Sequence, residues 1–168
     1  MPMKGIRSHR TNRTAIVMPV DVQVASSAVE IPRAREIQRW ADTALEEVAN
    51  DGEPPDLCIR VVDNEESLAL NSKFRGVDKP TNVLSFSADI DLPGENILGD
   101  VVICATVVYA EAADQGKSVG DHYAHMVVHG VLHLAGYDHE QQKDAELMEA
   151  LEIKILERVG VVDPYTMS

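Results

Sequence analysis

The sequence is poor in cysteine and has no long apolar run. Its two cysteines, Cys58 and Cys104, form neither a C-x-x-C pair nor a disulfide framework, so we expect both to be reduced core residues. The apolar runs fall far short of the ~18 residues that a bilayer span requires. The N-terminus also lacks the apolar stretch and cleavage site of a secretory signal. These absences predict a soluble, cytoplasmic protein with no membrane contact.

Basic residues are also scarce, because 15 lysines and arginines stand against 28 acidic residues, for a net charge of −13. Non-specific nucleic-acid binding depends on basic side chains that neutralise phosphates, so this balance excludes it over most of the surface. A local basic groove remains compatible with this acidic net charge. Residues 1–12 are expected to form a flexible basic tail, which could contact RNA, and residues 13–168 a single domain.

Apolar periodicity predicts the order strand, helix, strand, helix, strand, strand and three helices, with no internal repeat. This order is typical of an α+β sandwich, a small mixed sheet with helices packed on it. The strands are expected at 16–24, with Pro19 indicating a sheet edge, and at 57–62, 83–87 and 101–103. The helices are expected from Pro32 to the turn at 50–52, from Asp63 or Asn64 to about Phe74, from Thr106 to about Gln115, from Ser118 to Gly136, and from about Gln141 to Val159, the last with Leu147, Leu151, Ile155 and Val159 four apart.

Three histidines near the C-terminal end of the fourth helix form a metal-binding pattern. His129 and His133 are four residues apart, so on a helix they share one face with Cβ atoms ~5–6 Å apart. Gly136 suits a left-handed helix-ending conformation that would turn His139 back toward this pair. Three neutral imidazoles leave a fourth position for water, which is the catalytic type of zinc site. We therefore predict one catalytic metal ion held by His129, His133 and His139, with zinc as the expected metal, although such a site also accepts nickel, cobalt or copper.

The residues around these histidines indicate which reactions the metal site can catalyse. The spacing H-x-x-x-H-x-x-G-x-x-H is that of the metzincin peptidases, but Gly130 occupies the position of their general-base glutamate. Peptide hydrolysis is therefore disfavoured, since general acid–base catalysis supplies a factor of ~10²–10⁴. His122 and His125 are expected to pack or to support the ligands. Asp138 either accepts a hydrogen bond from a ligand imidazole or caps the final helix.

Residues His129 to His139 match the motif H-G-x-L-H-L-x-G-Y-D-H, and this motif resembles the signature of the YbeY family of bacterial endoribonucleases. The segment Asn71 to Phe86 is similar to a second family segment, N-x-x-[FY]-R-G-x-D-x-P-T-[DN]-V-L-S-F. The triplet Leu98-Gly99-Asp100 is a third. Asn82 stands where the family more often has aspartate, so no essential acid is expected there.

The resemblance implies a metal-dependent endoribonuclease that cleaves single-stranded RNA, with roles in maturation of the 16S ribosomal RNA 3′ end and in ribosome quality control. Small-subunit ribosomal proteins are candidate partners. The implied fold is zincin-like and α+β, with a mixed four-stranded sheet and about five helices. Arg75 is implied to be important, because a guanidinium binds phosphate with a fork of donors. Arg75 and His129 are the expected catalytic residues.

Three other interpretations remain open from the sequence. One is a zinc metallopeptidase-like hydrolase that shares the three histidines. Another is a non-enzymatic ribosome assembly factor that uses its metal for stability. The third and weakest is a hydrolase that acts on a small phosphoester. The sequence also leaves open whether the nucleophile is water or the RNA 2′-hydroxyl.

Overall fold

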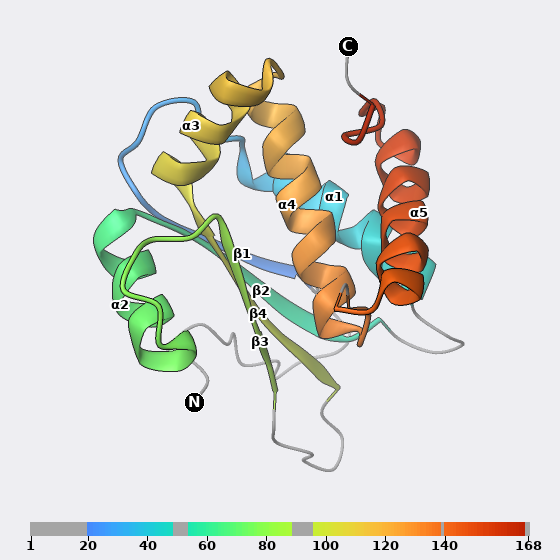
Figure 1. The fold of residues 1–168 in the computed structure, drawn as a ribbon, viewed down its shortest axis with the longest axis horizontal. Coiled ribbons are helices and arrows are strands. Elements are labelled where there is room, and N and C mark those ends of the chain that lie inside the picture. Colours follow the sequence, from blue (N-terminus) through green and yellow to red (C-terminus); the bar gives the residue numbers. More distant parts are fainter. Residues whose placement is uncertain (1–19, 49–53, 89–95, 139, 167–168) are drawn as a thin grey trace, which may run out of the picture.

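The computed structural model describes residues 20–48, 54–88, 96–138 and 140–166, which form a four-stranded sheet and five helices. The predicted α+β class and the predicted element order are both confirmed (Figure 1). The comparison with zincins stays a prediction. In chain order the elements are β1 (Val20–Ala25), α1 (Ala34–Val48), β2 (Asp56–Val62), α2 (Asn64–Arg75), β3 (Val83–Ser87), β4 (Ile97–Cys104), α3 (Ala105–Gln115), α4 (Val119–Leu134) and α5 (Gln142–Arg158).

The sheet is mixed, with strand order β1-β2-β4-β3. β1 pairs with β2 and β2 with β4 in parallel, whereas β3 pairs with β4 antiparallel. β1 lies at an edge, as predicted from Pro19, which itself is outside the described residues. β4 begins at Ile97 and is longer than the predicted 101–103, because its first residues pair with the start of β2. The most buried strands are therefore the two central ones.

The two faces of the sheet are covered by different helices. Val101 and Ile103 of β4 belong to the main core, which also includes buried residues of α1, α4 and α5. Val102 points the other way and packs with Leu70 of α2. Alternate residues of a strand face opposite sides, so β4 anchors both layers. Figure 1 shows α4 and α2 on opposite sides of the sheet.

Helix α4 is buried along most of its length and begins and ends as the sequence indicates. The Ser118 hydroxyl caps it by accepting from the backbone N–H of Asp121 at 3.1 Å. The helix ends at Leu134, and Gly136 follows with φ of +99°, the left-handed conformation predicted for it. The chain therefore reverses direction directly after the second histidine of the motif.

The predicted series of apolar residues four apart in the last helix follows the buried face only in part. Ile155 and Val159 are buried and Leu151 packs against the core, whereas Leu147 is 55% exposed. Successive residues four apart rotate by ~40° around a helix of 3.6 residues per turn, so such a series leaves any one face. The buried residues of α5 are Ile155 of this series together with Met148, Glu152 and Leu156.

Cys58 and Cys104 are buried and carry free thiols, as predicted. Burial, and then the nearby Asp100 carboxylate, raise the pKa of Cys58, so its thiol stays protonated. Within the described ranges no helix is both long and apolar enough to cross a membrane. The predicted basic tail, residues 1–12, lies outside the described residues.

Candidate metal centre

His129 and His133 lie one helical turn apart on α4, with their rings in contact. Their Nε2 atoms are 3.0 Å apart and their ring centroids 4.5 Å apart. Two nitrogens that each lie ~2.0–2.1 Å from a tetrahedral zinc ion are roughly 3.3 Å apart, so the pair is close to the spacing that a shared ion requires. His139, the third predicted ligand, lies outside the described residues.

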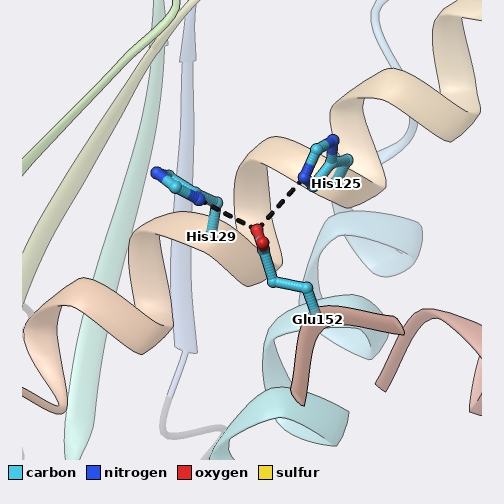
Figure 2. Close-up of side chains that lie close together, drawn as sticks. All are labelled: His125, His129 and Glu152. Atoms are coloured by element: carbon cyan, nitrogen blue, oxygen red, sulfur yellow. Dashed lines mark hydrogen bonds and ion pairs between the residues drawn. The ribbon is translucent and has the colours of Figure 1, made fainter. Parts of the chain in front are cut away.

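A buried carboxylate contacts the His129 ring at Nδ1, the nitrogen that does not face His133. One Glu152 oxygen, Oε2, accepts hydrogen bonds from His129 Nδ1 at 2.9 Å and from His125 Nε2 at 3.1 Å (Figure 2). The Tyr165 hydroxyl donates to the other oxygen, Oε1. Burial raises the pKa of Glu152, but the hydrogen bonds from His125 and His129 outweigh it and lower the pKa to about 2. Glu152 is therefore ionised and its negative charge is compensated by three donors.

The described residues offer two positions for a metal ion, one on each side of the His129 ring. His125, His129 and Glu152 present ligand atoms within 4.8 Å of one another and could hold an ion among them. The other position adjoins the Nε2 atoms of His129 and His133. The side chains of Glu152 and His125 are only 1% and 11% exposed, whereas a catalytic metal keeps one position open to water or substrate. Accessibility therefore favours the Nε2 side.

The tautomer of His129 also favours a metal ion on the Nε2 side of its ring. Glu152 accepts from Nδ1, so the proton of a neutral His129 ring lies on Nδ1 and the lone pair on Nε2. Metal-binding histidines commonly donate their second ring nitrogen to a carboxylate in this way. The donor set on the Nε2 side thus suits a divalent metal such as zinc, and Glu152 fits as the partner that orients a ligand.

A cavity of about 510 Å³ opens beside the histidine pair. Among the described residues that line it, Arg75 is the only lysine or arginine. Arg75 is exposed at the end of α2. The fold brings it to the same cavity as His129 and His133, although more than 50 residues of sequence separate them. The remaining lining residues are Asn82, Val83, Ser85, Ser87, Leu134, Gly136, Tyr137, Asp138 and Glu140.

Gly130 departs from the peptidase motif for a packing reason. A Cβ atom there would lie 2.7 Å from Cγ1 of Val101, closer than two carbons approach. The Ser85 hydroxyl also donates to the Gly130 carbonyl at 3.1 Å, which ties α4 to β3. A glutamate at this position would push the helix away from the sheet, so the general base of a metzincin does not fit.

The other polar residues near the motif take supporting contacts. His122 Nε2 lies 2.8 Å from Oε1 of Glu111, and burial lowers the His122 pKa. The Asn82 amide donates to the same carboxylate at 3.1 Å. Asp138 accepts from the backbone N–H of Glu140, and α5 has Gln141 as its N-cap, so the interpretation of Asp138 as the cap of the final helix is wrong.

Comparison with known proteins identifies the family. Residues 21–160 match the family model described as Endoribonuclease YbeY. This range includes more than half of the chain and all of the motif residues above. The chain belongs to the YbeY family. The resemblance predicted from the motif is thereby confirmed.

Individual YbeY proteins agree with the family match. The Endoribonuclease YbeY of Halorhodospira halophila is 54% identical over 138 residues, covering 80% of this chain and 88% of that protein. The Endoribonuclease YbeY of Colwellia psychrerythraea is 46% identical over 148 residues, covering 87% and 96%. The solution structure of TM1509 from Thermotoga maritima superposes with a TM-score of 0.55 at 26% identity, covering 82% of this chain and 88% of that one.

Sequence reasoning missed Glu152 and Tyr165. Glu152 left a signal, because it is an acidic residue on the same face of α5 as Met148 and Ile155, and a buried carboxylate needs partners. Tyr165 left none. It lies beyond residue 160, where the YbeY family match ends.

Proposed function

We propose that this chain is a zinc-dependent endoribonuclease that cleaves single-stranded RNA. Its ion would be held by His129, His133 and His139. One observation carries the proposal: the His129–His133 pair, with Nε2 atoms 3.0 Å apart, and the cation Arg75 line a single cavity in a member of a family of endoribonucleases. We further propose a role in maturation of the 16S ribosomal RNA 3′ end and in ribosome quality control, in the cytoplasm.

The residues divide the work between charge and position. A bound zinc ion would supply Lewis-acid polarisation and lower the pKa of a bound water to roughly 7. Arg75 would bind the scissile phosphate through two parallel N–H groups and offset charge as it develops. Glu152 would hold the His129 ring in the orientation that directs Nε2 at the ion. The nucleophile is either water or the RNA 2′-hydroxyl.

The charge of the chain limits where RNA binds. A net charge of −13 repels phosphate over most of the surface, so productive contact would be confined to the cavity and its rim. Arg75 would provide the attraction there. A small-subunit ribosomal protein would then add the contacts that the acidic surface lacks.

Metal removal tests the proposal. We expect about one zinc ion per chain in protein purified without a metal-affinity resin, since one site with three histidine ligands holds one ion. Chelation should abolish cleavage of a single-stranded RNA, zinc should restore it, and a duplex of the same sequence should resist cleavage. Elemental analysis paired with a gel assay of the RNA measures this.

Three results would contradict the proposal. Full RNA cleavage by thoroughly chelated protein would exclude metal-dependent chemistry. Cleavage of casein without cleavage of RNA would favour a peptidase. Complementation in cells by a variant with both His129→Ala and Arg75→Ala would favour an assembly factor.

A further inference from the structure

The segment that follows α5 brings a tyrosine back to the candidate metal centre. Tyr165 lies seven residues beyond the end of the helix, yet its hydroxyl donates to Glu152 and lies 3.3 Å from His125 Nε2. Figure 1 shows this segment on the side of α5 that faces α4. From this geometry we infer that Glu152 and Tyr165, which we name the C-terminal clasp, position His129 and thereby set the affinity for zinc. The inference rests on the proposed function and assigns two positioning residues to the same metal site.

The clasp acts through the orientation of one imidazole. A neutral histidine has two tautomers, and its ring can also rotate, so Nε2 presents a lone pair to an ion in only some states. Glu152 accepts from His129 Nδ1 at 2.9 Å and so selects the state with the lone pair on Nε2. Because Glu152 is 1% exposed, water does not replace it as the acceptor. Loss of the carboxylate would release the ring.

The second part of the clasp holds the carboxylate itself. The Glu152 Oε2 atom receives both imidazole donors, whereas Oε1 receives the Tyr165 hydroxyl. Each carboxylate oxygen thus accepts from a different side chain, and together these hydrogen bonds fix the plane of the carboxylate. Burial and then the adjoining Glu152 raise the pKa of Tyr165, so its phenol remains a donor at neutral pH.

The tyrosine is positioned by its own turn. The backbone N–H of Tyr165 donates to the Asp163 carboxylate at 2.8 Å, and the Thr166 hydroxyl donates to the Asp163 carbonyl at 2.8 Å. The Tyr165 ring also stands edge-on to the His125 ring, with centroids 5.5 Å apart. Tyr165 lies outside the family match at 21–160, so the clasp joins a residue within the matched region to one beyond it.

Zinc affinity tests the clasp without any activity assay. Competition with a chromogenic chelator is measured for the full chain and for Glu152→Gln and Tyr165→Phe. Glu152→Gln should weaken zinc binding ~10–100-fold, the usual effect of losing the carboxylate behind a ligand. Tyr165→Phe should weaken it roughly fivefold, the effect of one hydrogen bond.

Two matched controls separate the clasp from general effects of the substitutions. Glu157→Gln removes an exposed carboxylate on the same helix, and Tyr109→Phe removes a hydroxyl from a tyrosine that is 43% exposed, against 42% for Tyr165. Both should bind zinc as the unmodified chain does. If Glu152→Gln fails to fold, Tyr165→Phe decides the question alone.

A spectroscopic readout excludes a merely structural role. In metal-free protein, the ¹⁵N shifts of His129 should report one tautomer with Nδ1 protonated, and a mixture in Glu152→Gln. Variants that bind zinc normally and keep the single tautomer would overturn the clasp while leaving the proposed function intact. An unmodified chain that binds no zinc would overturn both.

Discussion

Replacing His133 by alanine is expected to abolish cleavage of single-stranded RNA and to weaken zinc binding by more than ~100-fold. The reason is geometric: His133 Nε2 lies 3.0 Å from His129 Nε2, so the two rings present their nitrogens to one ion. Loss of a direct ligand should exceed the ~10–100-fold effect of losing an outer hydrogen-bond partner. Isothermal titration with zinc, together with an RNA cleavage assay, measures both effects. His133 is only partly buried, so the variant should fold.

The matched control for this prediction is His125→Gln. His125 belongs to the alternative group of His125, His129 and Glu152, and it does not line the cavity. If the ion binds on the Nε2 side of His129, His125→Gln should weaken zinc binding by at most ~10-fold, through Glu152. The reverse ranking, with His125→Gln losing zinc and His133→Ala retaining it, would move the ion to the buried group.

Replacing Arg75 by alanine should lower kcat/KM for RNA cleavage by ~10²–10³ and leave zinc affinity unchanged. Arg75 is the only lysine or arginine among the described lining residues, so its loss leaves the phosphate with no basic side chain among them. Removal of one group that stabilises developing charge typically has an effect of this size. Steady-state cleavage of a fluorogenic RNA measures the rate.

Two further arginine variants sharpen this second prediction. Arg75→Lys keeps the charge but loses the two-pronged contact with phosphate, so its activity should fall between that of the unmodified chain and that of Arg75→Ala. Arg35→Ala removes an exposed arginine of α1 that is not among the cavity-lining residues. Its kcat/KM for RNA cleavage should equal that of the unmodified chain. Equal losses in Arg35→Ala and Arg75→Ala would mean that net charge, not position, accounts for the effect.

Local patterns in the sequence determine much of this structure. The alternation in β1 and the helical spacing from Ile37 to Val48 depend on neighbours along the chain, so they predict their elements correctly. The four-residue spacing of His129 and His133 likewise predicts that their rings share one face. The left-handed glycine after α4 follows from residue type, since glycine adopts positive φ without steric cost.

The rest depends on how distant elements pack. Glu152 reaches His129 only because α5 packs on α4 with a face that apolar spacing predicted only in part. Tyr165 joins them through a turn after the helix, for which no periodicity exists. The role of Gly130 is also tertiary, because its limit on side-chain size is set by Val101 in a different element.

Anomalous diffraction at the zinc edge, from crystals grown with zinc, tests the metal position most directly. We expect one anomalous peak ~2.0–2.1 Å from the Nε2 atoms of His129 and His133, with His139 as the third ligand. Glu152 should lie behind His129, on its Nδ1 side. A peak between His125, His129 Nδ1 and Glu152, or no peak at all, would contradict the account.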